Sequence, residues 1–112
     1  MEGSFDRYGF EHVQLDSLKD LDLLIAERFE LPERPYSKDI RAALEIVIWA
    51  LENTDSPYFA MFRGEKEALP GNPFGVGFER QVWGYATTAP LAICKQALYE
   101  IKRVEITLLV SE

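Results

Sequence analysis

Two side chains of this 112-residue sequence have the chemistry for nucleophilic catalysis, the single cysteine Cys94 and the single histidine His12. A catalytic thiol needs a partly exposed, electropositive setting and a base within reach. Cys94 falls on the apolar face of a helix expected at residues 89–102, where a buried thiol is inert, and His12 falls in a short, half-buried strand. No serine has the strand-turn-helix setting of a nucleophile elbow. We therefore predict no catalytic residues and no enzymatic activity.

Carboxylates and glycines are the other candidates for chemistry. Asp16, Asp20 and Asp22 crowd the start of a predicted helix, but the spaced oxygens and turn glycine of a calcium loop are absent. The glycine segment at 71–77, GNPFGVG, lacks the lysine and the following helix of a phosphate loop. One Cys and one His cannot build a structural zinc site. We predict no metal and no cofactor, and rank a small-ligand or cation-binding role of loop 64–77 last.

The strongest candidates for a binding surface lie in a proline-rich hinge and the helix that follows it. Arg41, Glu45 and Trp49 are spaced i, i+4, i+8, which places them on one helical face. One interpretation is an intrahelical Arg41–Glu45 ion pair on a solvated face. The other is a recognition face, in which these residues join Asp39 and an exposed hinge tyrosine, Tyr36, because interface hot spots favour Trp, Tyr and Arg.

The charge distribution indicates which partner such a face would attract. The net charge is −7, and residues 1–56 hold 13 Asp or Glu against 6 Lys or Arg, whereas residues 57–112 hold six of each. A negative field repels phosphate, so direct nucleic-acid binding is not expected. The field attracts a basic protein, although it also serves simply to keep the protein in solution.

The elements that position these residues begin with a strand at 8–15. A helix follows from the predicted N-cap Ser17 and ends before Pro32, because proline lacks the helical donor and disfavours helix in the residue before it. Its apolar face is made of Leu18, Leu21, Leu24, Ile25 and Phe29. Ser37 is the predicted N-cap of a second helix at about 38–53.

The second helix is apolar around most of its circumference and must be covered on more than one side. One stripe consists of Ile40, Ala43, Leu44, Val47, Ala50 and Leu51, and further apolar surface comes from Ile46, Ile48 and Trp49. We expect it to be the central helix of the domain, with half of a homodimer contact as the alternative.

The second half of the chain alternates strands and a helix. Residues 57–63 and 78–86 are predicted strands separated by the loop 64–77, and a long-looped hairpin is one way to pair them. Thr88 is the predicted N-cap of the helix at 89–102, and 104–112 forms a closing strand.

These elements predict one α/β domain spanning residues 1–112, in the order β-α-α-β-(β)-α-β. Its small sheet of three to four strands is partly parallel and packs on three main helices. The last two strands, joined by a helix, are the best candidates for a parallel pair. The single cysteine and the absence of a long apolar run favour a soluble, cytoplasmic protein.

The element order, together with SLKDLDLLIAERFELPERPYSKDIRAALE (17–45) and VEITLLVSE (104–112), resembles the barstar family of intracellular ribonuclease inhibitors. The resemblance implies a barstar-like fold and inhibition of a nuclease by carboxylates and a hinge tyrosine. With one residue inserted in the hinge, Tyr36 matches the hinge tyrosine and Glu45 the principal inhibitory carboxylate. The chain departs from the family at Ser37, where a glycine is usual, and at Arg41, where an acid is usual.

The function expected from these observations is that of an acidic inhibitor or antitoxin-like protein that neutralises a basic partner such as a nuclease or toxin. The partner-binding residues would be Tyr36, Asp39, Arg41, Glu45 and Trp49. The alternative is a self-associating structural or regulatory protein that buries Ile46, Ile48 and Trp49 against a second copy.

Overall fold

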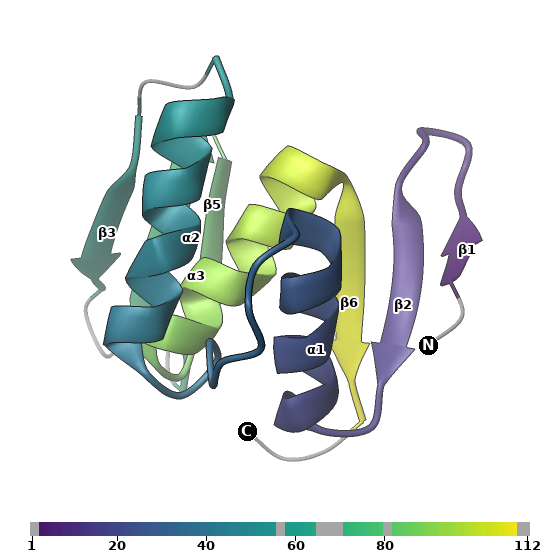
Figure 1. Ribbon diagram of the computed structural model, residues 1–112, viewed down its shortest axis with the longest axis horizontal. Helices are drawn as coiled ribbons and strands as arrows, with labels where there is room; N and C mark the ends of the chain where they lie inside the picture. Colours follow the sequence, from purple (N-terminus) through teal and green to yellow (C-terminus); the bar gives the residue numbers. More distant parts are fainter. Residues whose placement is uncertain (1–2, 56–57, 65–70, 80–81, 110–112) are drawn as a thin grey trace.

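The computed structural model describes residues 3–55, 58–64, 71–79 and 82–109. The elements in chain order are β1 (Gly3–Phe5), β2 (Glu11–Leu15), α1 (Leu18–Phe29), α2 (Ile40–Asn53), β3 (Ala60–Arg63), β4 (Phe74–Glu79), β5 (Val82–Ala86), α3 (Ala89–Ala97), the π-helical turn η1 (Leu98–Lys102) and β6 (Val104–Leu108). Figure 1 shows how they are arranged, with α3 running between two groups of strands.

The strands form two small sheets. Sheet A has the order β1-β2-β6, with β1 antiparallel to β2 and β2 parallel to β6, in a register that opposes Glu11 to Val104 and Leu15 to Leu108. Sheet B has the order β3-β4-β5 and is antiparallel throughout. The predicted α/β class, the three helices and a partly parallel sheet are confirmed, but the strands are divided between two sheets instead of one.

Two expectations about the strands are wrong. The last two strands do not pair with each other, because β5 belongs to sheet B and β6 pairs with β2. The segment from Phe74 onward is a strand and not a loop. Gly75 lies opposite Phe62, and a Cβ added at Gly75 would come within 2.6 Å of the Phe62 ring. The glycine therefore makes room for an aromatic ring on the neighbouring strand. In the sequence, a strand glycine of this kind cannot be distinguished from a loop glycine.

The helix starts follow capping chemistry, with one correction. Ser17 caps α1, since its side chain accepts a hydrogen bond of 3.1 Å from the backbone N–H of Asp20, and Thr88 caps α3. The predicted cap of α2 is wrong, because Asp39 performs that role by accepting from the Arg41 N–H at 2.9 Å. Ser37 lies two residues earlier, where its own N–H donates to the Asp22 carboxylate at 2.8 Å.

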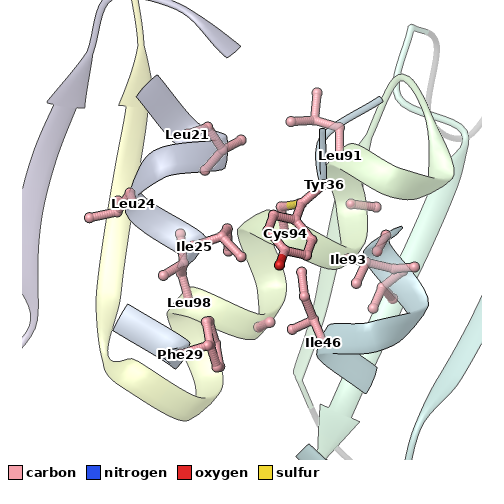
Figure 2. Close-up of a cluster of buried hydrophobic side chains, with 14 of the residues drawn as sticks. Leu21, Leu24, Ile25, Phe29, Tyr36, Ile46, Leu91, Ile93, Cys94 and Leu98 are labelled. Atoms are coloured by element: carbon pink, nitrogen blue, oxygen red, sulfur yellow. The ribbon is translucent and has the colours of Figure 1, made fainter. Parts of the chain in front are cut away.

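The core surrounds α3, and the expectation that α2 is the central helix is wrong. Figure 2 shows side chains from α1, α2, α3 and the hinge meeting in one cluster. The buried residues of α3 point in all directions and are Leu91, Ala92, Ile93, Cys94, Gln96 and Ala97. By contrast, α2 buries one face, made of Ala42, Ala43, Ile46, Val47 and Ala50. Because three of those five residues are alanines, α2 can approach α3 closely.

Candidate partner-binding surface

Tyr36 lies inside the protein, so the prediction of an exposed hinge tyrosine is wrong. Its side chain is 0% exposed and belongs to the central cluster (Figure 2). Its hydroxyl donates a hydrogen bond to the backbone carbonyl of Pro32, which satisfies the polar end of the ring locally. Burial raises the pKa of the Tyr36 phenol. The hinge therefore contributes a core residue, and Tyr36 offers no surface to a partner.

Glu45 is at the surface but has a different partner from the one expected. Its carboxylate lies 3.1 Å from the Arg34 Nε, so the ion pair joins the hinge to α2 instead of joining Arg41 to Glu45 within the helix. The two side chains are 50% and 39% exposed, and ion pairs of that kind contribute about 0–1 kcal/mol. Glu45 can therefore exchange this contact for a cation of another protein at little cost.

Trp49 is half-buried and packs against the protein's own aromatic and basic side chains. Its ring meets Phe29 edge to face with centroids 5.1 Å apart, and the Lys102 Nζ lies 4.8 Å from the Trp49 ring centre. The Lys102 cation covers a ring face that would otherwise be available. Trp49 therefore secures α2 to α1 and η1, and only part of it reaches the surface.

The surface feature that sequence reasoning missed is an exposed apolar stripe along α2. The α2 stripe consists of Ile40, Leu44, Ile48 and Leu51, with exposed fractions of 38%, 40%, 54% and 46%. Three of these four residues belong to the apolar stripe predicted from the sequence. Because α2 is apolar almost all round, periodicity alone does not show which arc faces inward. The three alanines share the inner face with Ile46 and Val47, and the four residues of the α2 stripe remain outside.

Charged residues border the α2 stripe on one side. Arg41, Glu45 and Glu52 follow one another at i, i+4 and i+11 along the adjacent face, and Asp39 stands at the start of the helix. Asp39, Arg41 and Glu52 are exposed. This arrangement of an apolar strip beside a charged border with an excess of carboxylates is typical of a protein interaction site.

Cys94 and His12, the two side chains with the chemistry for nucleophilic catalysis, lie in settings that do not favour it. Cys94 is completely buried, and burial raises the pKa of its thiol well above the usual range, which disfavours the thiolate. His12 lies on β2, exposed, with Asp6 2.8 Å from its Nε2 and Glu105 3.6 Å from its Nδ1. Both ring nitrogens thus face carboxylates and neither faces a nucleophile.

Neither a metal-binding cluster nor a membrane-spanning helix occurs in the described residues. The described residues contain no group of three or more His, Cys, Asp or Glu side chains that could hold a metal ion. Part of the loop proposed for a small ligand or cation, residues 65–70, lies outside the described residues. None of the helices in the described ranges has both the length and the apolar character needed to cross a membrane.

Comparison of this chain with protein-family models, with curated proteins and with solved structures gives no match.

Proposed function

We propose that this chain is a non-enzymatic binding protein that uses the α2 stripe and its acidic border to hold a basic partner. The observation that carries the proposal is the stripe, because four large apolar side chains in a row on one helix are 38% to 54% exposed. Monomeric proteins seldom leave such contiguous apolar surface facing water. Covering it would supply the binding energy, and the carboxylates around it would select the sign of the partner's charge.

The energetics of this surface fit a specific but modest interaction. Burying a Leu or Ile side chain fully stabilises by about 1.5–3 kcal/mol, so covering the remaining half of each of four such residues contributes roughly 3–6 kcal/mol before losses. Asp39, Glu45 and Glu52 add long-range attraction, which raises the association rate more than the affinity.

The resemblance to the barstar family supports a nuclease or a toxin as the partner class. Under this proposal Glu45 leaves Arg34 and pairs with a cation of the partner's active site, while the α2 stripe packs beside it. Tyr36 takes no part because it is buried. The binding residues are then Asp39, Arg41 and Glu45 together with the four residues of the stripe, and neutralisation follows from occupation of the cationic site.

Parallel affinity captures test the proposal. The full chain and the Ile48→Asp variant are immobilised and exposed to the same host extract, and the retained proteins are identified by mass spectrometry. We expect a basic protein on the unmodified chain and its loss on the variant. Leu109→Asp is the matched control, because Leu109 is 56% exposed but lies just beyond β6, away from α2. Identical sets of proteins on all three baits would exclude the stripe as the binding surface.

Self-association is the second candidate function, and it is supported by the same exposed α2 stripe. In that case α2 of one copy covers α2 of another. Ile46 cannot contribute as expected, because it is 0% exposed, whereas Ile48 can. The acidic border disfavours this arrangement, since it brings carboxylates of two copies together. Sedimentation velocity separates the candidates: a dimer that dissociates in Ile48→Asp favours self-association, and a monomer at all concentrations favours the basic partner.

A further inference from the structure

The last two strands, β5 and β6, are joined by a helical crossover but do not pair with each other. β5 leads through α3 and η1 into β6, the connection that normally joins neighbouring parallel strands. Here β5 is an end strand of sheet B and β6 is an end strand of sheet A (Figure 1). In the part of the chain that the structure describes, both strands are paired on one side only. Two open sheet edges are therefore connected by a single helix.

A cavity of about 200 Å³ lies between these two edges. Its lining comes from all three elements: Gly84 and Tyr85 from β5, Lys95, Gln96 and Tyr99 from α3 and η1, and Glu105 and Ile106 from β6. Glu105 is exposed, and both tyrosines are half-buried, so the cavity reaches the surface. The helix forms its floor, and the strand edges form its walls.

The backbone groups on both walls point into the gap. Glu11 N–H donates to the Arg103 carbonyl and Leu109 N–H to the Leu15 carbonyl, both at 2.9 Å. Since alternate residues of a strand direct their backbone groups to opposite sides, Ile106 directs its N–H and C=O away from β2. On sheet B, Gly64 N–H donates to the Pro73 carbonyl at 2.6 Å. The same alternation, carried across β4, directs the N–H and C=O of Tyr85 away from the sheet.

The floor of the cavity contains an unpaired polar group. Gln96 is 5% exposed, and its Nε2 has no hydrogen-bond partner. A buried amide of this kind destabilises the protein unless something binds it. Gly84 lies directly over it, because a Cβ at Gly84 would come within 1.9 Å of the Gln96 Oε1. The glycine leaves the amide room at the point where β5 faces the gap.

We propose that the gap between β5 and β6 binds an extended peptide segment of a partner protein, which adds a strand and joins the two sheets into one. The segment forms backbone hydrogen bonds with Tyr85 on one side and Ile106 on the other. It directs a side chain with an acceptor oxygen, such as Asp, Asn or Ser, toward Gln96. A small anion fits less well, because Lys95 and Glu105 line the same cavity with opposite charges and the walls are backbone edges.

Hydrogen exchange followed by NMR tests the open edges in the unmodified protein. We expect the amides of Glu105 and Gly84, which face their own sheets, to be protected, and those of Ile106 and Tyr85 to exchange at least about tenfold faster. Equal protection of all four amides would overturn the proposal, because the edges would then be closed.

A peptide probe tests the occupant. Random linear peptides of about twelve residues, displayed on phage, are selected on the full chain, and the best one is synthesised and titrated by fluorescence polarisation. We expect the bound peptide to protect the Ile106 and Tyr85 amides from exchange. The Ile106→Pro variant removes an N–H that makes no hydrogen bond with β2, and it should weaken peptide binding about tenfold or more.

Two control variants complete the test. Ile106→Val keeps the edge N–H and should bind the peptide as the parent does. Ile48→Asp, on the α2 stripe, should also leave peptide binding unchanged. A failure of strand addition is therefore distinguishable from a failure of the proposed function, which depends on the α2 stripe. A selection without binders, or binders whose bound state leaves the Ile106 and Tyr85 amides unprotected, would refute strand addition.

Discussion

At the scale of single residues, the most informative side chains are those whose surroundings differ from their sequence context. Tyr36 sits among charged and proline neighbours, RPYSKD, which predicts exposure, yet it is fully buried. Prolines at positions 32 and 35 turn the chain inward, and the hydroxyl is satisfied by the Pro32 carbonyl within four residues. Local composition shows where a hinge is, but the side of the hinge that meets the core depends on contacts with three helices.

Substitution of Tyr36 separates a core role from a binding role. Tyr36→Phe should lower the free energy of unfolding by about 0.5–1.5 kcal/mol through loss of one hydrogen bond, and Tyr36→Ala by roughly 3–5 kcal/mol. Urea unfolding measures both. Tyr36→Phe should leave the affinity for the captured partner unchanged, because the hydroxyl faces inward. Weaker binding with unchanged stability would contradict the buried position and restore the surface role that the barstar resemblance implies.

His12 on β2 is joined to Asp6, in the turn after β1, by a hydrogen bond whose strength should depend on pH. The hydrogen bond with the Asp6 carboxylate raises the pKa of His12 above its ordinary value of 6.5, and the same bond lowers the pKa of Asp6. Because the pKa of His12 is raised in the folded state, the protonated imidazole makes its full contribution to the stability of the fold below pH 6.5. This contribution is lost as the pH rises through the pKa of His12 in the folded state.

An NMR titration of the His12 imidazole measures this effect directly. Asp6→Asn should lower the pKa of His12 and remove the matching part of the pH dependence of unfolding. Glu105→Gln should lower the pKa less, because Glu105 acts only through space from 3.6 Å. An imidazole pKa that is the same in the parent and in Asp6→Asn would show that the hydrogen bond is absent in solution.

At the scale of elements, helices were predictable and sheet partners were not. Capping residues and apolar spacing placed α1 and α3 correctly, because both signals lie within a few neighbouring residues. Strand pairing depends on residues far apart in the chain, and no local signal shows that β6 pairs with β2 or that β5 is left at an edge. Gly75 also resembled a loop residue, because the Phe62 ring that needs its space lies on another strand.

The start of α2 offers a matched pair of substitutions. Asp39→Ala should cost about 1 kcal/mol, because it removes the acceptor for the Arg41 N–H. Ser37→Ala should be neutral or slightly stabilising, since the Ser37 hydroxyl is buried without a partner while its backbone N–H keeps the bond to Asp22. Thermal unfolding of the two variants compares them. The opposite order of stabilities would identify Ser37 as the cap, as the sequence alone had suggested.

At the scale of the whole molecule, the excess negative charge and the exposed apolar stripe lie in the same half of the chain. Every unit of the net charge of −7 belongs to residues 1–56, and α2 with its exposed stripe lies in the same half. The sequence was sufficient for this asymmetry, because charge counts need no fold. The candidate site needed the structure, because only packing against α3 decides which arc of α2 remains outside. Under the proposed function, the same half of the chain would attract the partner and present the surface that holds it.

This division predicts separate effects on association and dissociation. With the captured basic partner, the association rate should fall by about tenfold or more between roughly 0.05 and 0.5 M salt, because screening shortens the reach of the carboxylates. The charge reversal Glu52→Lys should slow association, whereas Ile48→Asp should mainly accelerate dissociation, because Ile48 acts only once it is covered. Stopped-flow and surface-binding kinetics resolve the two rates. Association that ignores salt, or an Ile48 variant that changes the association rate alone, would contradict this assignment of attraction to the acidic border and retention to the α2 stripe.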